Sequence, residues 1–161
     1  MYRNFAYIVE NFGTLLYNKK ANIKHTLKGE FTYMKKLMVK KGEECMACLE
    51  CVRACSTAFY KEFDEDLSCI KITAKGAGAK PVVCIQCGKC MKVCEHEAIT
   101  QNPKTGVYMI NKKKCLSCGK CVEICPMKVM VLKEGNPASK CIACGICVKA
   151  CPMEILEIVE K

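Results

Sequence analysis

The sequence predicts an α+β protein of two pseudo-symmetric lobes, preceded by a helical or extended N-terminal extension. Two observations predict this class. The cysteine spacing C-x2-C-x2-C-x3-C occurs four times in 161 residues, which indicates a repeated unit. Between the second and third copies, apolar residues flank the turn-forming stretch Asn102–Gly106, a pattern typical of two short strands in a hairpin. We therefore expect pairs of motifs to fold together, one pair in each lobe.

Sixteen of the seventeen cysteines lie in the four motifs. In each motif the first three cysteines are spaced so that their thiolates can surround one cubane [4Fe-4S] cluster, whereas the fourth binds the other cluster of a pair. The thiolates therefore suffice for four [4Fe-4S] clusters. The expected ligands are Cys45, Cys48, Cys51, Cys55, Cys84, Cys87, Cys90, Cys94, Cys115, Cys118, Cys121, Cys125, Cys141, Cys144, Cys147 and Cys151.

Disulfide bonds and zinc are the two alternatives for so many cysteines. A disulfide scaffold goes with secretion, but residues 1–30 lack a cationic start followed by an apolar run and a cleavage site. Zinc sites usually pair two C-x2-C hooks across a longer gap, whereas here a third and a fourth cysteine follow each hook directly. Both points favour iron–sulfur clusters. No stretch is long and apolar enough for a transmembrane helix, and we expect a cytoplasmic protein of an anaerobe.

The formal net charge of +10 by itself suggests an acidic partner such as nucleic acid. Each oxidised cubane with its four thiolates contributes a charge of about −2, so four clusters would bring the protein to about +2. This correction removes most of the argument for nucleic acid, and we expect none to bind. Lysine runs such as Lys112–Lys114 indicate either a solvated face or a docking patch for an acidic protein.

The chain before the first motif differs from the rest. Residues 1–40 hold most of the aromatic side chains, and apolar residues from Tyr2 to Leu16 approximate helical spacing. Three interpretations compete: a docking helix, a helix on a membrane surface, or an upstream extension of a reading frame that starts at Met34. Further on, Cys69–Thr73 alternates like a half-buried strand, and Lys75–Lys80 has the composition of a flexible loop.

The repeated part has a more regular pattern. Strands are expected at Ala98–Thr100 and Val107–Ile110, and a further strand at Lys128–Leu132. Between the third and fourth cysteines the second, third and fourth motifs predict one helical turn, which Pro126 and Pro152 would stop.

Three residues need separate comment, one inside the first motif and two outside the motifs. Glycine follows the second cysteine in three motifs, but Leu49 stands there in the first and would alter its turn. Cys69 is not needed as a ligand and is expected to be a small buried apolar residue. His96 is either a surface residue or one that tunes the potential of the adjacent cluster with pH.

Over about residues 41–161 the chain resembles the polyferredoxin-like iron–sulfur subunits of multi-subunit redox enzymes. The four motifs carry this resemblance, and the segments Cys45–Ser56 and Leu67–Ile72 are similar to the start of subunits that accompany tungsten aldehyde oxidoreductases. The resemblance implies two bacterial ferredoxin-like dicluster lobes. The outer lobe would comprise residues 41–83 and 133–161, and the inner lobe residues 84–132, after an extension at residues 1–40. The chain departs from the family at Ser56 and Glu95, where proline is usual.

The resemblance also implies nested pairs, the first motif with the fourth and the second with the third. The hairpin between the second and third motifs supports the inner pair independently. Sequential pairing of the first motif with the second and the third with the fourth stays open. The nested ligand sets would be Cys45, Cys48, Cys51 and Cys151 for cluster 1; Cys84, Cys87, Cys90 and Cys125 for cluster 2; Cys94, Cys115, Cys118 and Cys121 for cluster 3; and Cys55, Cys141, Cys144 and Cys147 for cluster 4.

By this resemblance the chain would relay single electrons through four clusters. Its partners would be a catalytic oxidoreductase subunit, of the molybdenum, tungsten or hydrogenase type, and a ferredoxin or other carrier. A cubane with four protein ligands has no open coordination position, and the sequence shows no other catalytic signature, so the chain is not expected to be an enzyme by itself. The alternative is a free-standing soluble polyferredoxin that shuttles between enzymes.

Overall fold

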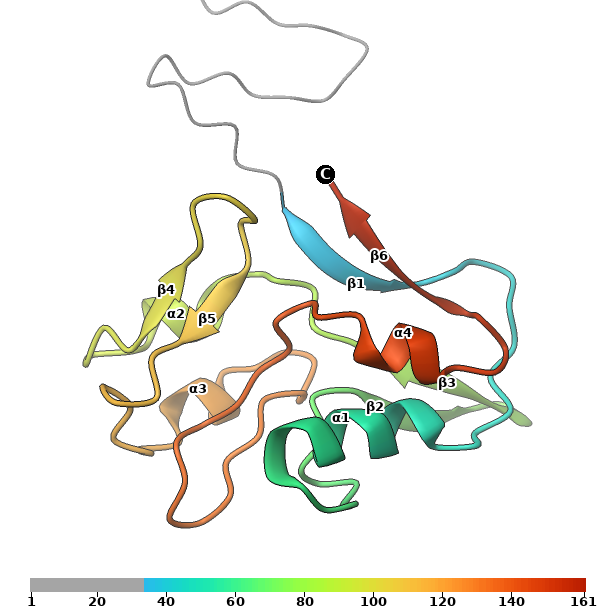
Figure 1. Ribbon diagram of the computed structural model, residues 1–161, viewed down its shortest axis with the longest axis horizontal. Helices are drawn as coiled ribbons and strands as arrows, with labels where there is room; N and C mark the ends of the chain where they lie inside the picture. Colours follow the sequence, from blue (N-terminus) through green and yellow to red (C-terminus); the bar gives the residue numbers. More distant parts are fainter. Residues whose placement is uncertain (1–33) are drawn as a thin grey trace, which may run out of the picture. The chain divides into compact units, whose positions relative to one another are not determined.

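The computed structural model describes residues 34–161 of the chain (Figure 1). The helix expected between Tyr2 and Leu16 lies outside the described residues. The described elements are, in chain order, β1 (Lys35–Val39), α1 (Glu50–Tyr60), β2 (Lys71–Lys75), β3 (Gly78–Val82), α2 (Lys89–Lys92), β4 (Ile99–Gln101), β5 (Tyr108–Ile110), α3 (Lys120–Glu123), α4 (Ile146–Ala150) and β6 (Leu156–Glu160).

The strands form three two-stranded antiparallel sheets, in which β1 pairs with β6, β2 with β3, and β4 with β5. Short helices alternate with these small sheets, which confirms the predicted α+β class. Within residues 34–161, no helix has the length and apolar character needed to cross a membrane.

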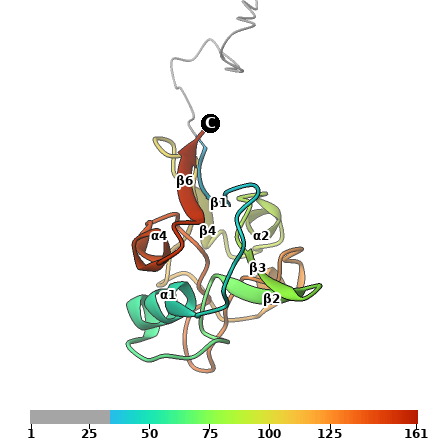
Figure 2. The ribbon, with the colours of Figure 1, turned by 90° about the vertical axis from the view of Figure 1, so that its right-hand side faces the viewer.

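The sheet of β1 and β6 joins the start and the end of the described chain (Figures 1 and 2). Lys35 is opposite Glu160 and Val39 is opposite Leu156. Leu37, in the middle of β1, is buried in the same apolar core as Val52 and Ile70. Residues 35–39, which the sequence assigned to the extension, thus form a strand that packs into this core.

The hairpin between the second and third motifs is confirmed. Ile99 is opposite Ile110 and Gln101 is opposite Tyr108. The Asn102 side chain closes the turn, because its Oδ1 accepts hydrogen bonds from the backbone N–H groups of Lys104 and Thr105 at 2.9 and 3.2 Å. Such local side-chain bonds are the reason that asparagine favours turns.

Two other expectations were wrong. Lys75–Lys80 is not a flexible loop, because strands β2 and β3 reach the turn at both ends and Lys75 is opposite Gly78. Gly76, with φ of 58°, takes the left-handed conformation of this tight turn. Lys128–Leu132 is not a strand. Lys128, with φ of 51°, still belongs to the turn after the third motif, and only an isolated bridge joins Val131 to Ser139.

Two apolar clusters make up the interior. The first contains Leu37, Val52, Ile70, Ile155 and Leu156 among its buried residues. The second is smaller and consists of Cys90, Ile99, Cys121, Met130 and Ala138.

The two clusters meet near residue 131, because Val131 packs in the first cluster whereas its neighbours Met130 and Leu132 pack in the second. The helices divide in the same way: α1 packs against α4, and α2 against α3 (Figure 1).

Candidate functional site

The four cysteine motifs share one backbone conformation around their second cysteine. The residue before it has a φ of 53–57° and the residue after it a φ of 60–83°, so two left-handed residues flank it in every motif. These residues are Ala47 and Leu49, Gln86 and Gly88, Ser117 and Gly119, and Ala143 and Gly145. The second position comes directly before the helix that carries the third cysteine. The chain therefore curls around the second cysteine and then enters a helix.

This conformation sorts the cysteines by exposure. The second cysteine of each motif is exposed, namely Cys48, Cys87, Cys118 and Cys144. The third is buried on the first turn of a helix, namely Cys51, Cys90, Cys121 and Cys147. Each motif thus presents one thiol at the surface and another in the interior.

Leu49 does not alter the turn of the first motif, contrary to expectation. It has a φ of 60° and takes the same left-handed conformation as the three glycines. A side chain in this region costs roughly 1–2 kcal/mol. The Leu49 side chain packs against the first apolar cluster, and burial of its apolar surface offsets this cost.

The first motif differs from the others after its fourth cysteine. Helix α1 continues for 11 residues, to Tyr60, whereas α2 and α3 have 4 residues each and α4 has 5. Ser56 replaces the usual proline and lies inside α1, where its hydroxyl donates to Arg53 O at 3.2 Å and accepts from Asp64 N at 3.4 Å. A proline at this position would break the helix.

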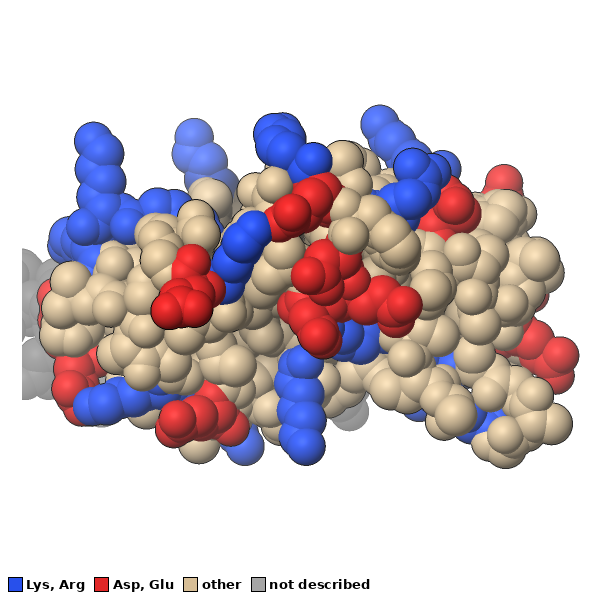
Figure 3. Space-filling view, turned by 90° about the horizontal axis from the view of Figure 1, so that it is seen from below, with Lys and Arg blue, Asp and Glu red and all other residues tan. Residues whose placement is uncertain are grey.

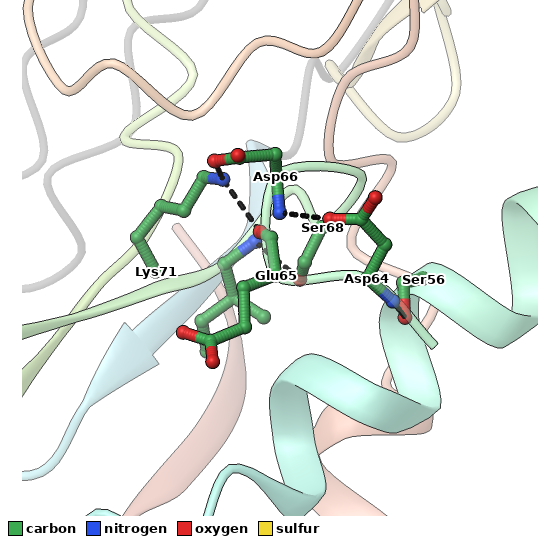
Figure 4. A network of polar contacts seen from close by, with 7 residues as sticks. Ser56, Asp64, Glu65, Asp66, Ser68 and Lys71 are labelled. Carbon is green, nitrogen blue, oxygen red and sulfur yellow. Dashed lines mark hydrogen bonds and ion pairs between the residues drawn. The ribbon is translucent and has the colours of Figure 1, made fainter. Parts of the chain in front are cut away.

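Figure 4 shows the polar network that follows, in which Lys71 Nζ donates to Glu65 O at 2.5 Å and Ile70 N donates to Ser68 Oγ at 3.2 Å. The network holds the chain between α1 and β2, and with it Cys69, against the end of the first motif.

Absence of proline does not lengthen the helix of the second motif. Its helix ends at Lys92 although Glu95 replaces proline. Glu97 N donates to Cys94 O at 3.1 Å, the same turn that Lys128 and Glu154 make after the fourth cysteines of the third and fourth motifs. The turn therefore tolerates proline without requiring it.

Four cavities gather the sixteen motif cysteines, and we number them by the motif that contributes three of them. Every cavity also takes the last cysteine of another motif. Cavity 1 is lined by Cys45, Cys48, Cys51 and Cys151; cavity 2 by Cys84, Cys87, Cys90 and Cys125; cavity 3 by Cys115, Cys118, Cys121 and Cys94; and cavity 4 by Cys141, Cys144, Cys147 and Cys55. The first motif thus shares its cavities with the fourth, and the second shares its cavities with the third.

The residues around the cavities suit an iron–sulfur cluster. Thiolates are the soft ligands that these clusters require, and each cavity supplies four. The remaining lining is mostly apolar, for example Ile72, Pro81 and Ile155 in cavity 1. Within residues 34–161, no three Cys, His, Asp or Glu side chains are close enough together to hold a single metal ion. A four-iron cluster does not need such close ligands, because each of its cysteines binds a different iron.

The buried thiols favour a bound cation. Burial, reinforced by neighbouring thiolates, raises the pKa of Cys51 and Cys121 to about 11 and that of Cys147 to about 12. These groups keep their protons at neutral pH unless positive charge compensates the thiolates. Because metal ligation requires the thiolate, binding a cluster releases these protons.

Cavity 4 contains a fifth thiol that the sequence did not connect with any site. Cys69 is 0% exposed, which confirms that it is buried, and it lines the cavity together with Cys55. The neighbouring Cys69 thiol lowers the pKa of Cys55 to about 6, against the opposing effect of burial. The closeness of Cys55, together with burial, raises the pKa of Cys69 well above its ordinary value. Only the folded chain brings these two residues together.

Two further residues lie at the cavities. His96 is exposed and lines cavity 3 together with Cys94, a position compatible with both interpretations, a surface residue or one that tunes the potential of the adjacent cluster. Lys140 is buried and lines cavity 2, which the sequence did not predict because lysine is rarely buried.

Three segments match known domain families. Residues 77–132 match a 4Fe-4S dicluster domain, and residues 42–58 and 138–157 each match a 4Fe-4S binding domain. The chain carries ferredoxin-type 4Fe-4S domains. The three matches indicate that the chain is an iron–sulfur electron-transfer protein. The dicluster match spans the second and third motifs, together with the β4–β5 hairpin between them. A search of curated proteins found no match to the chain.

The surface carries charges of both signs. On the face shown in Figure 3, acidic side chains gather near the middle and basic side chains project from the edges. Some of these groups pair: Lys71 with Asp66 at 3.3 Å, and Lys120 with Glu95 at 2.5 Å. A mixture of this kind is typical of a solvated surface.

Proposed function

We propose that the protein relays single electrons through four [4Fe-4S] clusters, one in each cavity. The grouping of four cysteines in every cavity is the observation that supports this most directly. A bound cluster accepts and releases one electron without forming or breaking a bond to substrate. Because the four thiolates of a cavity would occupy all four irons, none of the four clusters would leave a position for substrate, and the proposed role is that of a carrier and not of an enzyme.

The proposed ligand sets are the nested ones, with cluster 1 in cavity 1 and so on to cluster 4 in cavity 4. Contacts of α1 with α4 and of α2 with α3 support this pairing independently of the cavities. None of these four cavities combines cysteines of the first and second motifs, as sequential pairing would require. The matched domains support the count of four, since the dicluster domain spans two motifs and the other two domains span one each.

The chain gives each cluster one edge at the surface. The second cysteine of every motif is exposed, and so is the large apolar side chain two residues before it: Met46, Ile85, Leu116 and Ile142. Electrons can therefore enter and leave beside the second cysteine, where an apolar side chain is available for contact with a partner.

We propose a catalytic oxidoreductase subunit, of the molybdenum, tungsten or hydrogenase type, as one partner, and a ferredoxin or other soluble carrier as the other. This rests on the resemblance of residues 41–161 to polyferredoxin-like subunits, and so does a cytoplasmic, anaerobic setting. A free-standing shuttle is the second candidate, and the exposed edge at every cluster favours it. Purification from the native source under anaerobic conditions separates the two, because a subunit elutes with a larger metalloenzyme and a shuttle elutes alone.

Anaerobic reconstitution with iron and sulfide tests the number of clusters. We expect about 16 irons and 16 sulfides per chain, the content of four cubanes. Cys87→Ser should perturb one of them, while the matched change Cys69→Ser should leave the iron content unchanged. An iron content that saturates at half this value in the wild-type chain would contradict a four-cluster relay.

The pairing is tested with single cysteine variants that are compared by the paramagnetic NMR signals of their cluster ligands. Nested pairing predicts that Cys55→Ser and Cys144→Ser alter the same cluster. Sequential pairing predicts instead that Cys55→Ser alters the same cluster as Cys87→Ser.

A further inference from the structure

Lys140 is a charged residue in an unusual position. It is only 2% exposed, although lysine is almost never fully buried unless it is paired. Its Nζ donates hydrogen bonds to Gln86 Oε1 at 2.8 Å, to Tyr108 O at 2.9 Å and to Cys141 O at 3.0 Å. Three donated bonds use all three N–H groups of an ammonium, so the group that these acceptors hold is the cation.

None of the three acceptors carries a negative charge. The ion pairs formed among residues 34–161 involve Arg53, Lys71, Lys120 and Lys133, and all of these cations lie at the surface or are partly exposed. A buried ammonium without an anion costs free energy, even when its hydrogen bonds are satisfied. The surroundings of Lys140 should therefore provide a negative charge.

Cavity 2 is where that charge would be. Lys140, Gln86 and Tyr108 all line it, next to the four thiols of the proposed cluster 2. Burial raises the pKa of Cys90 in this cavity, and the Lys140 cation partly opposes that rise, which fits a lysine close to the cluster ligands. A cubane with four thiolates carries a charge of about −2 when oxidised and one more negative charge when reduced. The cation faces a group that becomes more negative as it accepts an electron.

We propose that Lys140 is the built-in counter-charge of the cluster in cavity 2, and that it raises the reduction potential of this cluster. The inference rests on the proposed function. A buried cation interacts more strongly with the cluster than a surface cation does, because little water lies between them. Since the reduced cluster carries the larger negative charge, it gains more from the cation than the oxidised cluster does.

The position of Lys140 adds a consequence for the relay. Cavity 2 belongs to the second and third motifs, but Lys140 directly precedes Cys141, which lines cavity 4. Gln86 connects the same two places, because its Nε2 donates to Cys141 O at 3.0 Å while its Oε1 accepts from Lys140. The charge thus stands where the inner and outer pairs of motifs meet, and it makes cluster 2 the more favourable destination for an electron that crosses between them.

The test compares Lys140→Gln with Lys89→Gln. Lys89 lines the same cavity but is exposed, so both variants remove one positive charge from one site. In redox titrations followed by electron paramagnetic resonance, we expect Lys140→Gln to lower the potential of one cluster by about 59 mV. This corresponds to a tenfold change in the ratio of its two states for a one-electron couple. Lys89→Gln should shift it by less than half as much, because solvent screens its charge.

Two more variants test the proposal if the Lys140→Gln protein fails to bind its clusters. Lys140→Arg retains the charge and should retain the potential. Gln86→Glu places a carboxylate next to the unchanged lysine, neutralises the site and should lower the potential in the same direction. The affected cluster is identified as cluster 2 when its NMR signals are those that Cys87→Ser perturbs.

The proposal is overturned if Gln86→Glu leaves all potentials unchanged, or if Lys140→Gln and Lys89→Gln give equal shifts. Both outcomes would leave the relay itself intact. Failure of the relay would appear instead in the iron content of the wild-type chain.

Discussion

The two pairs of motifs use the same cysteine spacing but are held together differently. The outer pair, formed by the first and fourth motifs, has the 11-residue helix α1, strands of 5 residues in β1 and β6, and twelve buried residues in its core. The inner pair has helices of 4 residues, strands of 3 residues and only five buried core residues, two of which are Cys90 and Cys121.

One ligand spacing is thus supported in two ways. Apolar packing contributes much of the stability of the outer pair, since residues distant in the chain, such as Leu37 and Leu156, share one core. The inner pair has little such packing, so we expect ligation of its clusters to supply most of its folding free energy.

Removal of iron should reveal the largest difference in stability between the inner and outer pairs of motifs. We expect a chelator to abolish protection from hydrogen exchange in β4 and β5 first, while amides of α1 and of the β1–β6 sheet exchange later. The physical reason is that the inner pair loses its main source of stability with the metal, whereas the outer core keeps its apolar contacts. Hydrogen exchange followed by mass spectrometry measures this. Equal loss of protection in both regions, or earlier loss in α1, would contradict the comparison.

A proline in the first motif tests the helix that distinguishes the outer pair. Ser56→Pro should destabilise the protein by about 3 kcal/mol, because the ring clashes with the preceding turn of α1 and removes a backbone donor. We expect the thermal midpoint to fall by roughly 6–12 °C.

Glu95→Pro is the matched control for the inner pair. Pro126 and Pro152 already occupy this place in the third and fourth motifs, and the turn there is the same. The change removes only the exposed pair with Lys120, and solvent-exposed pairs of this kind contribute little to stability. Similar midpoints for the two proline variants, measured by circular dichroism, would show that α1 does not depend on Ser56.

The glycines after the second cysteines give a smaller contrast. An alanine Cβ at Gly88 would lie 2.7 Å from the Tyr108 hydroxyl, whereas at Gly145 the nearest atom, on Ile158, is at 3.6 Å. Both changes place a side chain in the left-handed region, at roughly 1–2 kcal/mol each.

Gly88→Ala should cost about 1 kcal/mol more than Gly145→Ala, because Tyr108 must move. The half-life of the cluster absorbance under mild denaturant reports this difference. Equal half-lives would indicate that Tyr108 moves aside without cost.

Cys69 provides the smallest expected effect and concerns only the outer pair. Cys69→Ala should retain the full iron content but lower the potential of the cluster in cavity 4, since the cavity loses an S–H group beside Cys55 that can donate to the sulfurs of the cluster site. We expect a shift smaller than that of Lys140→Gln. Cys69→Ser keeps a donor and should restore most of the potential. Loss of four irons in Cys69→Ala would instead make Cys69 a ligand.

Local patterns in the sequence predicted much of this molecule. The hairpin around Asn102 and the helical turns that carry the third cysteines depend on contacts between near neighbours, and both are present. The strand expected at Lys128–Leu132 failed, because Lys128 is committed to the turn that follows Cys125. The sequence did not predict the length of α1. Ser56 permits the helix to continue, but only the folded chain shows that an apolar core packs against the helix.

The cysteine spacing was enough to identify the sixteen thiols of the motifs, because the positions of ligands along the chain reflect the local geometry of a cubane. Only the folded chain shows which cysteines share a cavity, since the fourth cysteine of each motif meets three that lie far away in the chain. The same is true of Lys140 and Cys69. Burial, and the electrostatic effect that follows from it, depends on what distant segments place around a side chain, and no local pattern records that.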